Sequence, residues 1–223
     1  MTRRRIIIVD DHPLFRSALK QTLAGGDTTV VVEEAGDLSG LSAALEADRD
    51  CDLVLLDLNM PCTRGVSGLL LVRAQYPDIP VMIISAVEDS TVIRRAFELG
   101  AAGYLHKSAG PTEIRRAIET VLSGEMFVPA GASLAVEDNH SALMRRLSTL
   151  TPQQVRVLMM LSDGLMNKQI AYELSISEAT VKAHVSAILQ KLDVDSRTQA
   201  VIAAARIEEG EFEALFNLGA EKT

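Results

Sequence analysis

The stretch Ile6-Ile7-Ile8-Val9-Asp10-Asp11, near the start of the chain, decides the fold. It is an apolar β-branched run that ends in two acids, and a second run, Leu53-Val54-Leu55-Leu56, ends in Asp57. Short, continuous apolar runs of this kind are typical of strands buried on both faces of a parallel sheet. Because the carboxyl ends of parallel strands open onto one crevice, we expect Asp10, Asp11 and Asp57 to lie together there.

Three carboxylates in one crevice repel one another unless a cation lies among them. Mg²⁺ suits this role because it prefers oxygen ligands and usually takes one or two carboxylates while keeping water and phosphate oxygens. The start of the chain therefore predicts magnesium-assisted phosphate chemistry.

The first half of the chain alternates short apolar runs with segments of helical periodicity. The expected strands are 6–9, 29–32, 53–56, 81–84 and a run around 104–105, and the expected helices are 13–23, 38–46, 68–75, 92–99 and 112–122. Repeated strand–helix units predict an α/β fold, a flavodoxin-like five-stranded parallel sheet in the order 2-1-3-4-5 with helices on both faces.

Two further polar residues follow expected strands at the same edge of the sheet. Ser85 follows the run 81–84, and Lys107 follows the last strand. The ammonium group of Lys107 can reach a phosphoryl oxygen as a mobile point charge. This set of groups matches the phosphorylation of an aspartate, in which a carboxylate attacks phosphorus. Two acids would bind the cation and a third would accept the phosphoryl group, while the hydroxyl and the ammonium group would contact its oxygens.

These residues resemble the receiver domain of two-component response regulators. The matching pieces are Val9-Asp10-Asp11-His12-Pro13, Leu56-Asp57-Leu58-Asn59-Met60-Pro61, Ile83-Ile84-Ser85-Ala86 and Gly103-Tyr104-Leu105-His106-Lys107, within about residues 4–124. The resemblance implies that Asp57 is the phosphoacceptor, and that Ser85 and Lys107 hold the phosphoryl group. It implies that Asp10, Asp11 and Asp57 bind Mg²⁺ with the backbone carbonyl of Asn59. It also implies that Tyr104 is a switch that turns inward when Ser85 moves toward the phosphate.

Two histidines border these motifs. His12 is expected to start the first helix rather than to take part in the chemistry. His106 stands where the family often has an apolar residue, and we interpret it as a tolerated surface variant.

Charge is unevenly distributed along the chain, whose net charge is −8. Residues 1–129 hold 13 Lys and Arg against 18 Asp and Glu, whereas residues 141–206 hold 8 against 5. A basic second half indicates that this part meets a polyanion. The two cysteines, Cys51 and Cys62, have no metal-ligand spacing and are interpreted as free thiols. With no apolar stretch near membrane-spanning length, we expect a cytoplasmic protein that does not bind a membrane.

Residues 129–140 lack periodicity and combine Pro, Gly, Ser and Ala, as a flexible tether does. We therefore expect a receiver domain at 1–128, a linker at 129–146, a DNA-binding domain at 147–207 and an acidic tail at 208–223, which we assign no role.

The second half predicts a small all-α domain of four helices. Thr151 and Gln154 form a capping box, Asn167 and Ser177 are expected helix caps, and a short turn at 174–176 joins two helices. Such a pair is a helix-turn-helix, whose second helix can lie in the major groove of DNA. Val181, Val185, Ile188 and Leu192 form its expected buried stripe.

The opposite side of this long helix is polar or small, which suits a DNA groove. The predicted DNA-contacting residues, including a backbone contact from the preceding helix, are Lys168, Thr180, Lys182, Ala183, Ser186 and Gln190. Small apolar residues of the last helix, from Ala200 to Ile207, offer a surface for a symmetric helix pair.

This half resembles the LuxR-type helix-turn-helix over about residues 147–206, through Leu150-Thr151-Pro152, Gly164-Leu165-Met166-Asn167-Lys168-Gln169-Ile170-Ala171 and Ser177-Glu178-Ala179-Thr180-Val181-Lys182-Ala183-His184-Val185. A receiver joined to this module is similar to the NarL/FixJ family of response regulators. The resemblance implies a transcription regulator and not an enzyme. Its implied partners are a sensor histidine kinase, double-stranded DNA, a second copy of the chain after phosphorylation and RNA polymerase.

Two alternatives stay open at this point. An aspartyl-phosphate hydrolase also uses a strand-end Asp with Mg²⁺, but such an enzyme has a second Asp where this chain has Asn59. The other alternative is a receiver that acts through protein contacts, with the second half serving as a dimerisation bundle.

Overall fold

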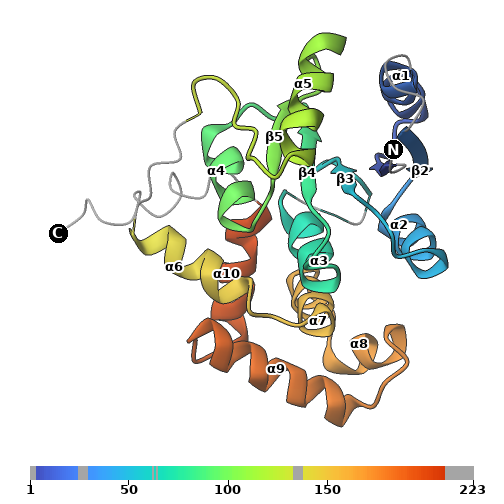
Figure 1. Cartoon of the computed structure of the whole chain (residues 1–223). Coiled ribbons are helices and arrows are strands. Elements are labelled where there is room, and N and C mark those ends of the chain that lie inside the picture. The colour runs from blue at the N-terminus through green and yellow to red at the C-terminus, as the bar shows by residue number, and fades with distance from the viewer. Residues whose placement is uncertain (1–3, 25–29, 62, 64, 133–137, 209–223) are drawn as a thin grey trace.

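The computed structural model describes residues 4–24, 30–61, 63, 65–132 and 138–208. In Figure 1 an α/β layer structure lies above a group of helices from the second half of the chain. Cys62, residues 133–137 of the expected linker and residues 209–223 of the expected tail lie outside the described residues. None of the helices in the described part of the chain has the length and apolar character that a membrane crossing requires.

The first half contains a five-stranded parallel sheet in the order β2-β1-β3-β4-β5, which confirms the predicted topology. The strands are β1 (Arg4–Val9), β2 (Val30–Ala35), β3 (Leu53–Leu56), β4 (Val81–Ser85) and β5 (Gly103–His106). In this order β1 and β3 are neighbours, with Val9 paired to Leu56. The residues that follow both strands therefore meet at one point of the sheet edge.

Alternating residues of the strands point to two separate apolar layers. Ile6 and Ile8 belong to one layer and Ile7 and Val9 to the other. The first layer is covered by α1 (Pro13–Ala24) and α5 (Pro111–Leu122). The second is covered by α2 (Leu38–Ala47), α3 (Ser67–Gln75) and α4 (Ser90–Glu98). Burial of both faces explains the continuous apolar runs of β1, β3 and β4, whereas the edge strand β2 contains Glu33 and Glu34 and is only partly buried.

The chain after α5 returns to the free edge of β5. The N–H of Phe127 donates to the carbonyl of Ala102 (3.1 Å), and the N–H of Tyr104 donates to the carbonyl of Phe127 (3.0 Å). This close approach needs a glycine in β5, because a Cβ at Gly103 would lie 3.0 Å from Val121 and 3.3 Å from Phe127. The segment therefore begins as an extension of the sheet, a feature that the sequence did not predict.

The second half is helical, as predicted. Its helices are α6 (Asp138–Leu147), α7 (Pro152–Ser162), α8 (Asn167–Glu173), α9 (Glu178–Leu192) and α10 (Arg197–Glu208). Thr151 and Gln154 form the expected capping box, and Ser177 caps α9. Asn167 is not a cap, because α8 begins at this residue and its side chain accepts a hydrogen bond from Arg197 (3.1 Å).

Helix α6 occupies part of the range expected to be a linker. Met144 and Leu147 are buried, and Arg146 donates to the carbonyl of Leu192 (3.0 Å) at the carboxyl end of α9. The expectation of a flexible tether over residues 129–140 therefore fails for residues 138–140, which belong to α6, and the linker bounds 129–146 stay a prediction. Leu143, Met144 and Leu147 already have helical spacing, and this apolar face packs as part of the second half.

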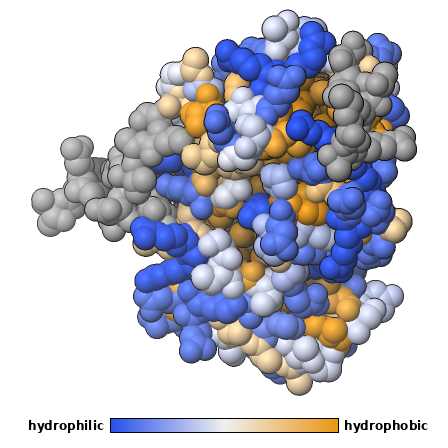
Figure 2. Space-filling model, in the orientation of Figure 1, coloured by the Kyte–Doolittle hydropathy of each residue, from blue (hydrophilic) through white to orange (hydrophobic). Residues whose placement is uncertain are grey.

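The two halves contact each other directly, α3 against α7 and α4 against α6. Arg156 of α7 lies 3.5 Å from the side-chain oxygen of Gln75 at the end of α3. Buried apolar residues form one continuous layer from the receiver into the second half. Figure 2 shows hydrophilic residues interspersed with smaller hydrophobic patches over this face of the molecule.

Candidate phosphorylation site and DNA-contacting surface

The site at the carboxyl edge of the sheet is built from the residues that follow β1 and β3. The N–H of Asp57 donates to the carbonyl of Val9 (2.9 Å), so the ladder continues up to the acid. Asp10 and Asp57 are each only 2% exposed. Buried carboxylates are costly without partners, so their placement here requires compensating charge.

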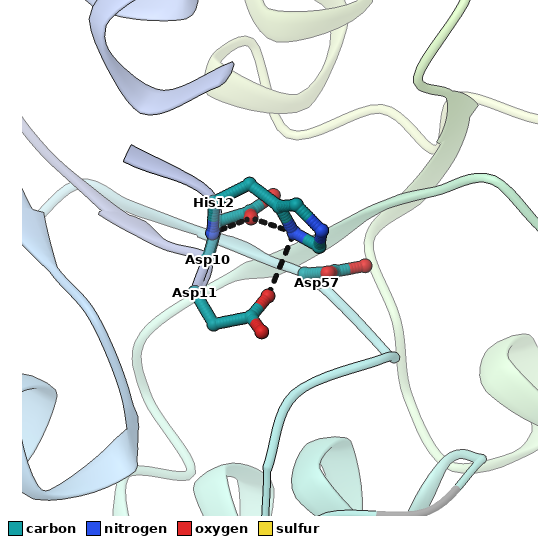
Figure 3. Close-up of side chains that lie close together, drawn as sticks. All are labelled: Asp10, Asp11, His12 and Asp57. Atoms are coloured by element: carbon teal, nitrogen blue, oxygen red, sulfur yellow. Dashed lines mark hydrogen bonds and ion pairs between the residues drawn. The ribbon is translucent and has the colours of Figure 1, made fainter. Parts of the chain in front are cut away.

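Three carboxylates and one imidazole converge at this edge (Figure 3). One ligand atom from each of Asp10, Asp11, His12 and Asp57 lies within 4.8 Å of the others. His12 lies 2.7 Å from Asp11 Oδ1 and 3.1 Å from Asp10 Oδ1, both measured from Nδ1. The carbonyl of His12 accepts the N–H of Arg16, so the residue does start α1 as predicted. The sequence interpretation missed the contact of its ring with the acids.

Lys107 supplies positive charge to this acidic cluster. Its Nζ lies 2.7 Å from Asp10 Oδ2 and 2.8 Å from Asp57 Oδ2. Burial alone would lower the pKa of Lys107, but its hydrogen bonds with Asp10 and Asp57 outweigh burial, and the pKa is raised. The ammonium group therefore stays charged at neutral pH and bridges the two buried acids.

The acidic cluster fits a divalent cation. Asp57 Oδ2 is held by Lys107, whereas Oδ1 is buried and has no hydrogen-bond partner among the described residues. A buried carboxylate oxygen without a partner is costly, and coordination to a cation would satisfy it. With Asp11 and Asp10 beside it, this oxygen belongs to a donor set of the kind that hard cations prefer.

Ser85 and Tyr104 lie next to the acids, on β4 and β5. Ser85 is fully buried, and its Oγ accepts a hydrogen bond from the N–H of Val87 (3.2 Å). The hydroxyl of Tyr104 donates to the carbonyl of Val87 (2.8 Å). Burial raises the pKa of Tyr104 to about 12. Both predicted switch residues thus contact the loop between β4 and α4. The ring of Tyr104 is only 1% exposed, so it already faces inward beside Ser85, and the part of both residues in switching stays a prediction.

His106 is not the simple surface variant that the sequence suggested. Its Nε2 lies 3.0 Å from the carbonyl oxygen of Ala86, and its Nδ1 lies 2.5 Å from Ser108 Oγ. The ring therefore joins the β4–α4 loop to the β5–α5 loop. An apolar residue is what the family pattern led us to expect, but an apolar side chain could make neither contact.

Asn59 lies two residues after Asp57, and its side chain is exposed. Its predicted contribution of a backbone carbonyl to the metal stays a prediction.

The predicted DNA-contacting residues lie on the exposed surface of α8 and α9. The exposed set is Lys168, Thr180, Lys182, Ala183, Ser186 and Gln190. On the other side of α9, Val181, Ile188 and Leu192 are buried and Val185 is half-buried, as the periodicity predicted. Lys182 Nζ lies 3.1 Å from Glu178 Oε1 within the helix, an exposed pair that a phosphate can replace.

The last helix differs from the sequence expectation. Ala200, Ala203 and Ala204 are buried, and α10 packs against α7 and α9 of the same chain. These three alanines therefore serve close packing within the module and are not exposed for a symmetric helix pair. Val201, which belongs to the same expected set, is half-buried, and the helix pair itself stays a prediction.

Two family models match the chain. Residues 6–119 match the response regulator receiver domain, and residues 148–204 match the luxR family of bacterial regulatory proteins. The chain therefore belongs to the response regulators that join a receiver to a luxR-type DNA-binding module. It is a DNA-binding transcriptional regulator of a two-component system, and its family is not one of enzymes.

The chain is similar over nearly its whole length to a glycerol metabolism activator of Pseudomonas putida, with 40% identity over 212 residues, 92% of this chain and 96% of the relative. The structure of a LuxR family DNA-binding response regulator from Silicibacter pomeroyi shows 37% identity and a TM-score of 0.51, covering 57% of this chain and 98% of the other. A second solved structure, of two RcsB dimers bound to two parallel DNAs, shows 21% identity and a TM-score of 0.55, covering 92% of this chain and 100% of the other. This last likeness is one of fold.

Proposed function

We propose that Asp57 is the residue that accepts phosphate from a sensor histidine kinase, and that this modification controls DNA binding by the second half. The observation that carries the proposal is that the two oxygens of Asp57 differ. Oδ2 lies 2.8 Å from Lys107 Nζ, and Oδ1 is buried without a hydrogen-bond partner in the part of the chain that the structure describes. A carboxylate with one oxygen oriented and the other unsatisfied is prepared for a cation and for a phosphoryl group.

Asp10, Asp11 and Asp57, with the backbone carbonyl of Asn59, would hold Mg²⁺. When bound, this ion would neutralise charge on the phosphoryl oxygens. An oxygen of Asp57 attacks phosphorus, forming an acyl phosphate while the bond from phosphorus to the donor breaks. The ammonium group of Lys107, already beside Asp57, would then contact an oxygen of the phosphoryl group. Ser85 would then exchange its contact with Val87 for one with a phosphoryl oxygen, while the ring of Tyr104, which is already turned inward and only 1% exposed, would stay beside it.

The second half would read DNA through α9. Lys182, Ala183, Ser186 and Gln190 would face the major groove, while Lys168 and Thr180 would contact the backbone. One module with few basic residues neutralises few phosphates and binds weakly at physiological salt. We therefore infer that two phosphorylated copies bind a repeated or palindromic site, a view supported by the RcsB dimers seen on DNA. A regulator that contacts bacterial DNA and RNA polymerase works in the cytoplasm.

The test replaces the acceptor and keeps its shape. Asp57→Asn should abolish incorporation of labelled phosphate from acetyl phosphate with Mg²⁺, and with it the gain in DNA affinity. Asp78→Asn is the matched control, because Asp78 is an exposed acid of the same domain. Labelling of the Asp57→Asn protein at the wild-type level would show that the acceptor is another residue.

A further inference from the structure

The loop between β4 and α4 is held by two side chains of β5. Tyr104 and His106 lie two positions apart on one strand, so their side chains lie on the same side of the sheet. Tyr104 donates to the carbonyl of Val87 (2.8 Å), and His106 Nε2 lies 3.0 Å from the carbonyl of Ala86. The carbonyls of two successive loop residues are thus bound by two side chains of β5.

The hydrogen-bonding pattern defines the state of the imidazole ring. A carbonyl oxygen only accepts, so Nε2 must carry the hydrogen that it shares with Ala86. The N–H of Ser108 donates to Nδ1 (3.2 Å), and Ser108 Oγ lies 2.5 Å from the same atom. Nδ1 is therefore the acceptor of the N–H of Ser108. The ring thus contacts Ser108 of the β5–α5 loop through Nδ1 and Ala86 of the β4–α4 loop through Nε2.

This contact lies directly beside Ser85. In the sheet Ser85 of β4 is paired with His106 of β5, and the N–H of Lys107 donates to the carbonyl of Ser85 (2.9 Å). The hydroxyl of Ser85 accepts the N–H of Val87 and so is turned toward its own loop. For the hydroxyl to reach a phosphoryl group on Asp57, the residues after Ser85 must change conformation. Ala86, whose carbonyl is held by His106, is the first of them.

We propose that His106 is a positioning residue that holds the β4–α4 loop in the unphosphorylated arrangement. Its hydrogen bond to Ala86 must break before Ser85 can contact the phosphoryl group. This inference rests on the proposed phosphorylation of Asp57 and adds to it a residue outside the acidic cluster. His106 acts through the loop and touches neither the metal ligands nor the phosphoryl group.

The contact has a predictable effect on binding at Asp57. A ligand that binds only the rearranged loop has an apparent dissociation constant that falls as that loop becomes more populated. Loss of one hydrogen bond of ordinary strength changes such a population by about fivefold. Removing the His106 contact should therefore tighten binding of a phosphoryl mimic rather than weaken it, the opposite of ordinary damage to the site.

The experiment measures binding of beryllofluoride with Mg²⁺ to the full chain, followed by the amide resonance of Val87. His106→Leu removes both ring contacts at similar volume and should bind about fivefold more tightly than the wild type. His106→Gln can still donate from Nε2 and should stay within about twofold of the wild type. His106→Asn is too short to reach Ala86 and should resemble His106→Leu, which keeps the test decisive if the leucine variant does not fold.

Glu88→Gln is the matched control for charge near the ring. Glu88 Oε1 lies 3.4 Å from Nε2, but its side chain is 78% exposed, so this variant should bind the mimic as the wild type does. Unchanged binding by His106→Leu or His106→Asn, or a glutamine variant that behaves as they do, would overturn the role of His106. Absence of phosphate labelling in the wild type would instead overturn the proposed acceptor, so the two failures are distinguishable.

Discussion

The receiver and the DNA-binding module place their polar functional residues in opposite surroundings. Asp10 and Asp57 are each 2% exposed and Ser85 is fully buried, whereas the predicted DNA-contacting residues of α9 are exposed. In the receiver, Lys107 reaches Asp57 across 50 positions of sequence. In α9, the corresponding surface comes from successive turns of one helix.

This difference predicts how each region responds to substitution. A buried charge depends on a few partners, so removal of one partner leaves the rest uncompensated and costs much. Exposed residues on a helix are compensated by water, so their removal affects the ligand and spares the fold. Substitutions at the receiver site should therefore change both function and stability. Substitutions on the predicted DNA-contacting surface should change DNA binding and leave stability unchanged.

The largest effect is expected for Lys107→Ala. Without divalent cations, Asp10 and Asp57 would lose the ammonium group that lies within 2.8 Å of both, and the free energy of unfolding at neutral pH should fall by about 3 kcal/mol. Urea denaturation measures this change. Lys20→Ala is the control, because Lys20 makes an exposed pair with Glu34 (3.1 Å) and should cost less than about 1 kcal/mol. Equal losses in both variants would contradict the contrast between buried and exposed charge.

Tyr104 offers a test that depends on pH. Burial raises its pKa from 10.0 to about 12, so the folded protein favours the neutral phenol. The contribution of the neutral Tyr104 phenol to the free energy of unfolding is complete below pH 10 and is lost as the pH rises through about 12. Tyrosinate absorbance should show one late-titrating component, and Tyr104→Phe should remove it. A wild-type titration with no late component would show that this ring is not enclosed as the structure has it.

The smallest effect is expected for Lys182→Ala. Loss of a phosphate contact should weaken DNA binding by about tenfold and lower the slope of log affinity against log salt by about one for each copy bound. The unfolding free energy should stay within about 0.5 kcal/mol of the wild type, because the side chain is 65% exposed. Glu119→Ala, an exposed position of α5 in the receiver, is the control for DNA binding. Unchanged salt dependence would remove Lys182 from the DNA-contacting surface.

Much of the receiver could be predicted from sequence because its signals are local. Each apolar run identifies a strand, and the acid, serine or lysine that follows it lies at the strand end. The parallel arrangement then brings Asp10, Asp57 and Lys107 to one edge. For α9, a spacing of three and four residues separated the buried stripe from the exposed surface.

The sequence did not predict the contacts that depend on neighbouring elements. His106 was interpreted as a tolerated surface residue, yet its ring joins two loops whose relative position only the folded sheet defines. The alanines of α10 suggested an interface between copies, but α7 and α9 already cover them. Likewise, Phe127 extends the sheet, and α6 packs where a tether was expected.

The sequence alone thus determined where the strands lie in the chain, which acids follow them and which sides of α9 are buried and exposed, because periodicity and strand ends are properties of a single segment. The tertiary structure decided which oxygen of Asp57 has no hydrogen-bond partner among the described residues, which loop carbonyl His106 contacts, and how α3 meets α7. These features require side chains from distant segments to occupy one place, and only packing of the whole chain sets that arrangement.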